Sequence, residues 1–173
     1  SSAPNYPLAA GILDLCRNAN LVAATCIEIS DHLSTQLHCI KDRLFVVRII
    51  QQLLYYAKLR LVTSEMGEAT LLQTCDILLQ RTELLLQLIF CGGTATASAV
   101  VELSRSLSLS MLADPQKARV LRERLIENDM ADLALLVANK CGVETEPIWA
   151  AKALRMLETN RYQEAKQLFR YCL

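Results

Sequence analysis

The sequence is poor in residues that interrupt helices. Its 173 residues include only 5 glycines and 4 prolines, and aromatic residues make up 5%. Apolar residues nevertheless reach 53%, so most of them are Leu, Ile, Val and Ala. Because Leu and Ala are strong helix formers, this composition favours an all-α chain. The length is that of about one domain, enough to bury a substantial core.

The chain also lacks an excess of charge of either sign. Its 18 Lys and Arg residues balance 18 Asp and Glu residues. A nucleic-acid binder uses surplus positive charge to displace counterions from phosphates, so we expect no nucleic-acid partner. A neutral, leucine-rich chain is only marginally soluble by itself. We therefore expect a piece of a larger assembly whose end faces are normally covered.

The cysteines show no spacing typical of a zinc site or a disulfide framework. Their number is odd, no Cys-x-x-Cys pair occurs, and each has apolar neighbours. This pattern predicts reduced thiols that are buried as small hydrophobic side chains in a cytosolic protein. The seven are Cys16, Cys26, Cys39, Cys75, Cys91, Cys141 and Cys172.

No pattern typical of an active site is present. His32 and His38 are six positions apart, whereas two metal ligands on one helix face are four apart. Gly92-Gly93 is followed by neither Lys-Ser/Thr nor a third glycine, so it is not a phosphate loop. We expect no enzymatic activity, no cofactor and no metal. A less favoured alternative is a helical-bundle enzyme with a histidine beside a carboxylate in a deep polar pocket.

Residues 84–101 form an uncharged stretch of 18 residues, near the length that spans a bilayer. However, Gly92-Gly93 followed by Thr94 predicts that one helix stops there and that another is capped. A buried hairpin is therefore favoured over a transmembrane segment. The chain begins without Met and without the basic segment of a secretory signal, from which we expect an internal fragment.

Apolar residues recur at helical spacing almost to the end of the chain. Asp114-Pro115 is typical of a helix start, and Asn160 with Gln163 resembles a capping box. The pattern predicts helices over 8–19, 21–40, 42–62, 64–90, 95–112, 116–127, 130–140, 146–158 and 160–173. We divide the chain into a loop over 1–7, hairpins of an α-solenoid over 8–113, and tetratricopeptide-like hairpins over 114–173.

The last third of the sequence repeats itself. Ala150 follows Ala118 by 32 positions, and the same offset joins Leu125 to Leu157 and Val137 to Phe169. The second unit is similar to a tetratricopeptide repeat, truncated at Leu173, and an ordinary helical bundle is the alternative. The residues expected to pack within the repeat are Trp149, Tyr162, Ala165, Phe169, Leu125 and Val137.

Four basic residues lie close together near the start of this region. They are Lys117, Arg119, Arg122 and Arg124, and acidic residues are interspersed with them. A solvated helix face is the favoured interpretation, and a site for an anionic partner or a lipid head group is the alternative.

Residues 115–173 resemble the C-terminal helical region of the spastizin family, the large FYVE-finger proteins of the hereditary spastic paraplegia group. The turn at 158–161 lacks the glycine expected there. The matching residues are Arg122-Glu123-Arg124-Leu125-Ile126, Leu133-Ala134, Lys140-Cys141-Gly142, Trp149-Ala150-Ala151, Glu164-Ala165-Lys166, Phe169 and Cys172-Leu173.

The resemblance implies a cytoplasmic α-solenoid, peripheral on late endosomes and lysosomes. It implies spatacsin and adaptor protein complex 5 as partners in protein transport, lysosome reformation, autophagy and cytokinesis. The family's FYVE finger, which binds phosphatidylinositol 3-phosphate, needs closely paired cysteines that this chain lacks, so membrane association would be indirect. We therefore expect a non-enzymatic scaffold segment for protein-protein interaction, and a membrane- or lipid-engaging helical domain is the alternative.

Overall fold

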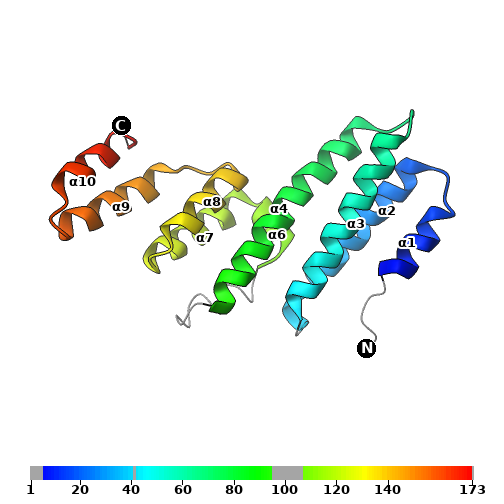
Figure 1. Ribbon diagram of the computed structural model, residues 1–173, viewed down its shortest axis with the longest axis horizontal. Coiled ribbons are helices and arrows are strands. Elements are labelled where there is room, and N and C mark those ends of the chain that lie inside the picture. The colour runs from blue at the N-terminus through cyan, green and yellow to red at the C-terminus, as the bar shows by residue number, and fades with distance from the viewer. Residues whose placement is uncertain (1–5, 41, 95–106, 173) are drawn as a thin grey trace.

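The computed structural model describes residues 6–40, 42–94 and 107–172, and every regular element in these ranges is a helix. The predicted all-α class is therefore confirmed. Most of the helix predicted over 95–112 lies outside the described residues. The helices form an elongated row, with the two ends of the chain far apart (Figure 1).

The N-terminal half is built of long helices. Its elements are α1 (Tyr6–Asp14), α2 (Ala19–Thr35), the 3-10 turn η1 (Leu37–Cys39), α3 (Arg43–Thr63) and α4 (Ala69–Thr94). The C-terminal half contains α6 (Leu109–Ala113), α7 (Pro115–Glu127), α8 (Ala131–Cys141), α9 (Glu146–Glu158) and α10 (Tyr162–Phe169).

Helix α3 lies between α2 and α4 and buries two faces. Val47 and Ile50 belong to the larger core cluster, which also includes residues of α4, α7 and α8. Leu53 and Ala57 belong to a second cluster shared with α2 and Cys75 of α4. The larger cluster reaches Ile148 in α9, so one core joins the two parts of the chain that we divided at residue 114.

Two helix boundaries differ from the prediction, and an asparagine side chain binds the backbone near each of them. Helix α1 ends at Asp14, and Asn18 then caps α2 by accepting a hydrogen bond of 3.1 Å from the Leu21 amide. The fourth helix begins at Ala69 rather than near Ser64. Between α3 and α4, Asn20 bridges the chain, since its side chain binds the Met66 carbonyl and the Glu68 amide at 3.0 Å each.

The predicted helix stop at Gly92-Gly93 is wrong, because α4 continues through both glycines to Thr94. Each glycine in a helix costs only about 1 kcal/mol relative to alanine. Burial of Leu84, Leu85 and Leu88 immediately before them can offset this cost. Within the ranges that the structure describes, no helix combines the length and the apolar character needed to cross a membrane.

The helix ends of the C-terminal half were predicted more accurately. Asp114 caps α7 through hydrogen bonds from the amides of Gln116 (2.9 Å) and Lys117 (3.5 Å). Gly142 ends α8 with a left-handed φ of 66°, as a helix-ending glycine should. The capping box at Asn160 is wrong: the residue before α10 is Arg161, which makes no side-chain cap.

Candidate functional site

The C-terminal hairpins α7–α8 and α9–α10 have the same backbone design. Helix α7 spans Pro115–Glu127 and helix α9 spans Glu146–Glu158. The two helices therefore begin 31 positions apart and also end 31 positions apart. The turn of each hairpin contains one residue with left-handed φ, 64° at Asp129 and 60° at Asn160. Each turn is closed by an equivalent 2.8 Å backbone hydrogen bond, from the Met130 amide to Leu125 and from the Arg161 amide to Met156.

The repeat offset of 32 predicted from residue types is therefore one position too long. At an offset of 31, Leu125 corresponds to Met156. Ala134 then corresponds to Ala165, and these two alanines are fully buried. Leu157, which the sequence paired with Leu125, is 36% exposed. The left-handed turn residue fixes where the second helix of each hairpin begins. This residue is Asp129 in the first hairpin and Asn160 in the second. Because the two residue types differ, matching residue types along the sequence did not reveal the correct offset.

The residues expected to pack within the repeat do not all do so. Leu125, Val137 and Ala165 are buried. Trp149 and Phe169 are half-buried, and Trp149 stacks on Tyr171 with 5.5 Å between the ring centroids. The prediction for Tyr162 is wrong, because it is 61% exposed and its hydroxyl donates to the Asn160 side chain at 2.7 Å.

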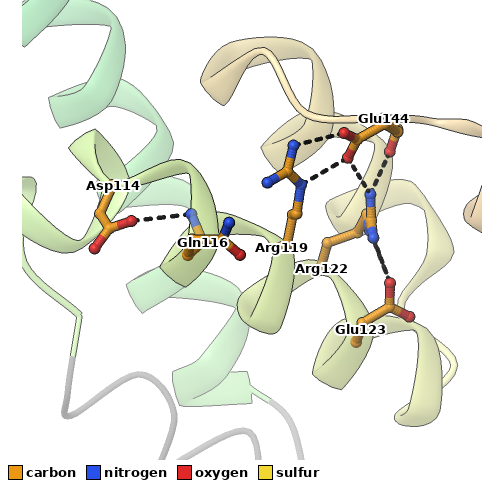
Figure 2. A network of polar contacts seen from close by, with 6 residues as sticks. All are labelled: Asp114, Gln116, Arg119, Arg122, Glu123 and Glu144. Atoms are coloured by element: carbon orange, nitrogen blue, oxygen red, sulfur yellow. Dashed lines mark hydrogen bonds and ion pairs between the residues drawn. The ribbon is translucent and has the colours of Figure 1, made fainter.

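Two arginines of α7 converge on Glu144, which lies in the connection between α8 and α9 (Figure 2). Arg119 donates two hydrogen bonds, of 2.9 and 2.6 Å, to the carboxylate. Arg122 donates to the Glu144 carbonyl oxygen at 2.7 Å and to its carboxylate at 3.3 Å. Its other side contacts the Glu123 carboxylate at 3.1 and 2.5 Å. The network therefore ties α7 to the chain segment that leads into the second hairpin.

The electrostatics of this network differ from those of a solvated face. Hydrogen bonding from Arg119 is the main cause that lowers the pKa of the Glu144 carboxyl to about 2, with Arg122 contributing less. Arg122 is only 6% exposed, so the prediction of a solvated helix face is wrong for this residue. It holds for Arg124, which is exposed.

The basic residues of α7 do not form a patch of unpaired charge. Arg119 and Arg122 are engaged with Glu144, and Lys117 lies 3.7 Å from Asp114. Arg124 is the member of the group without an ion pair to a described residue. Because three of the four cations already pair with carboxylates, the structure gives the alternative of an anionic-partner or lipid site here no further support.

Polar contacts also hold α9 against the first hairpin. Arg155 forms an ion pair with Asp129 and donates to the Ile126 carbonyl oxygen at 3.3 Å. Lys152 lies 3.4 Å from the Asp132 carboxylate and 5.9 Å from the centre of the Trp149 ring. These contacts border a narrow cleft of about 180 Å³ between the two hairpins.

The histidine and cysteine side chains that the structure describes lie on or near several helices. His32 is exposed on α2, with Nε2 3.0 Å from the Gln36 amide nitrogen, and the side chain of His38 lies outside what the structure describes. No group of three or more potential metal ligands occurs among the described residues. Burial, with a smaller effect from Cys75, raises the pKa of the Cys26 thiol to about 11. Cys39 is exposed, contrary to the expectation that every cysteine is buried.

Comparison with known proteins gives distant relatives but no family assignment. No family model matches the chain, and no solved structure matches it. An uncharacterised Dictyostelium discoideum protein is 39% identical over 173 residues, which cover 98% of this chain. Zinc finger FYVE domain-containing protein 26 (spastizin) of human and of rat is 27% identical over 172 residues, or 99% of this chain.

In all of these relatives, the matched region is a small part of a much longer protein. The chain spans about 6% of the length of each. The similarity to zinc finger FYVE domain-containing protein 26 also covers the N-terminal helices, which the sequence resemblance over 115–173 did not reach. The comparisons thus support, at a distance, a resemblance between this chain and a segment of spastizin.

Proposed function

We propose that this chain is a non-enzymatic scaffold segment, an α-solenoid of helical hairpins that binds other proteins. The observation that carries the proposal is the 31-residue repeat of α7–α8 in α9–α10, including the left-handed turn residue and its closing hydrogen bond. Repeated hairpins that stack on their neighbours build extended surfaces suited to protein binding. The tetratricopeptide-like character belongs to this C-terminal end.

Exposed apolar side chains on the long helices support a role in protein binding. Tyr55, Leu59 and Val62 are exposed on α3 at spacings of four and three, so they share one face of the helix. Exposed apolar groups that gather on one face are typical of interaction surfaces.

The biological setting rests on the similarity to zinc finger FYVE domain-containing protein 26. We place the chain in the cytoplasm, at late endosomes and lysosomes, in protein transport, lysosome reformation and autophagy, and also in cytokinesis. Spatacsin and adaptor protein complex 5 are the proposed partners. Membrane association would come from a FYVE finger elsewhere in a longer protein.

The test is capture of purified spatacsin, or of purified adaptor protein complex 5, on the immobilised chain. We expect saturable capture by the wild type and reduced capture when an exposed side chain of the second hairpin is changed, as in Leu154→Glu. Leu21→Glu on α2 is a matched control, since it places the same charge on an equally exposed leucine far from the second hairpin. Absence of capture by the correctly folded wild type would contradict the proposal.

A membrane- or lipid-engaging helical domain is the second candidate. It is favoured by α1, where Leu8 and Ile12 are exposed four positions apart and therefore share one helix face, and by Leu15, which is exposed directly after α1. Flotation of the chain with phosphatidylserine-containing liposomes tests it. Flotation that Ile12→Glu abolishes would establish lipid binding, whereas a chain that stays at the bottom of the gradient would exclude it.

A further inference from the structure

The second hairpin contains an open cleft that the scaffold proposal does not explain. We call it the α9–α10 cleft, and it has a volume of about 560 Å³. Its lining residues are Met156 of α9, Glu164, Gln167 and Leu168 of α10, and Arg170 and Tyr171 directly after α10. Helices α9 and α10 pack through Ala153 and Ala165, both fully buried, so the hairpin beneath the cleft is closely packed.

One side of the α9–α10 cleft is apolar and held in place. Met156 and Leu168 are half-buried and supply aliphatic surface. Tyr171 is positioned from two directions, since its ring stacks on Trp149 at 5.5 Å and the next residue, Cys172, contacts the Glu146 carbonyl oxygen at 3.7 Å. Tyr171 is itself 66% exposed, and an aromatic ring beside aliphatic groups offers a seat for an apolar side chain.

The other side of the α9–α10 cleft carries an exposed positive charge that is not paired with a described acidic residue. Glu164 is neutralised by Arg161, whose Nε donates to it at 2.8 Å. Arg170 is exposed and has no ion pair with a described residue. From Arg161 to Arg170 there are three basic residues, including Lys166, and one acidic residue. The local field therefore favours an anionic group at Arg170.

The corresponding surface of the first hairpin is different. At the offset of 31, Leu133 of the first hairpin corresponds to Glu164, and Leu136 corresponds to Gln167. Both leucines pack against the larger core cluster. Because the second hairpin has a carboxylate and an amide where the first hairpin has two leucines, the rim of the α9–α10 cleft is hydrophilic. Such a rim is poorly suited to burial beneath another apolar helix face, whereas it suits a peptide that is partly solvated.

We propose that the α9–α10 cleft binds a short segment of a partner protein in which a large apolar side chain lies beside a carboxylate. The apolar side chain would lie against Met156, Leu168 and Tyr171, and the carboxylate would pair with Arg170, whose planar guanidinium suits bidentate contact. The volume is within the range of about 300–1,000 Å³ that is usual for ligand sites. This inference rests on the proposed scaffold function and names the chemistry of one of its partners.

The test is selection of peptides from a random display library on the whole chain, followed by titration of the selected peptides. Trp149 is the sole tryptophan and stacks on a residue of the cleft, so its fluorescence reports occupancy. We expect selected peptides with an apolar residue next to Asp or Glu and a saturable fluorescence change. Arg170→Glu should weaken binding about tenfold, equivalent to about 1.4 kcal/mol.

A charge-reversed peptide, with Lys in place of the acidic residue, should regain affinity for Arg170→Glu. Arg124→Glu is the matched control, because it reverses an exposed cation outside the cleft, and it should bind like the wild type. The proposal is overturned if no peptide is enriched, if enriched peptides lack acidic residues, or if Arg170→Glu binds normally. Sedimentation that shows a dimer dependent on Arg170 would also overturn it, because a second copy would then be the occupant.

Failure of this inference is separable from failure of the scaffold function. If spatacsin or the adaptor complex is captured equally by the wild type and Arg170→Glu, the scaffold function stands and the cleft is not its binding site. If peptides bind the cleft as expected but neither protein is captured, the named partners are wrong and the cleft's specificity stands.

Discussion

The guanidinium of Arg122 donates a 2.7 Å hydrogen bond to the backbone carbonyl oxygen of Glu144, 22 residues later in the chain. Since the same arginine also contacts the Glu144 carboxylate, it fixes both the backbone and the side chain at the entry to the second hairpin. A buried cation thus contributes to the relative placement of the two C-terminal hairpins.

Replacement of Arg122 by alanine should destabilise the chain by about 1–3 kcal/mol. The variant loses the packing of a nearly buried side chain and leaves the Glu144 carbonyl oxygen without its donor. The released carboxylates of Glu123 and Glu144 are half exposed and can be solvated, which keeps the loss moderate. Urea unfolding followed by circular dichroism measures it. Arg124→Ala, two positions away and exposed, should stay within about 0.5 kcal/mol of the wild type.

Stability should also depend on pH through Glu144. Its folded pKa of about 2 is below the ordinary value of 4.5, so its ion pairs stabilise the fold fully above pH 4.5 and this stabilisation is lost as the pH falls towards 2. The Tm of the wild type should exceed that of Glu144→Gln at pH 7, and the difference should shrink between pH 5 and pH 2. A difference in Tm that is the same at every pH would show that the charge of Glu144 contributes nothing. Glu158→Gln, at an exposed position, is the control.

Two glycines should respond to alanine in opposite directions. Gly142→Ala should destabilise the chain by about 1–2 kcal/mol, because its φ of 66° is left-handed. Gly11→Ala should stabilise it by roughly 0.5–1 kcal/mol, because Gly11 lies within α1 and a Cβ there would meet no atom within 4 Å. Thermal unfolding of both variants measures this, and a stabilised Gly142→Ala would contradict the left-handed helix end.

How far the sequence predicts this structure depends on whether a feature is local. Asp114 and Gly142 act on the backbone beside them, so their roles as helix start and helix end were predictable. Gly92-Gly93 was misleading, because whether a helix survives a glycine pair depends on the burial of its neighbours by other helices. Burial of that kind is a tertiary property that no local pattern contains.

The candidate site was less predictable than the fold for the same reason. Charge spacing placed Arg119, Arg122 and Arg124 on one helix but did not show that Glu144 folds back onto two of them. The register of the repeat was misjudged by one residue, since a single left-handed turn residue decides it. The α9–α10 cleft was not predicted, because its lining comes from a helix, the next helix and the segment after it.

The cysteines should differ strongly in reactivity towards Ellman's reagent at pH 8. Cys39 is exposed and should react within seconds to minutes. Cys26 and Cys75 are fully buried and burial raises both thiol pKa values, so they should react only as fast as the chain unfolds. Mass spectrometry of the labelled peptides assigns each site. Rapid labelling of Cys26 in the folded chain would contradict the second core cluster.

Amide hydrogen exchange tests whether the repeated C-terminal hairpins form a protein-binding surface. Exchange is measured for the chain alone and with purified spatacsin, or with purified adaptor protein complex 5, at saturating concentration. We expect slower exchange in α9 and α10 on binding, with the buried middle of α3 unchanged. Exchange in α7–α10 that is identical with and without either partner would contradict it.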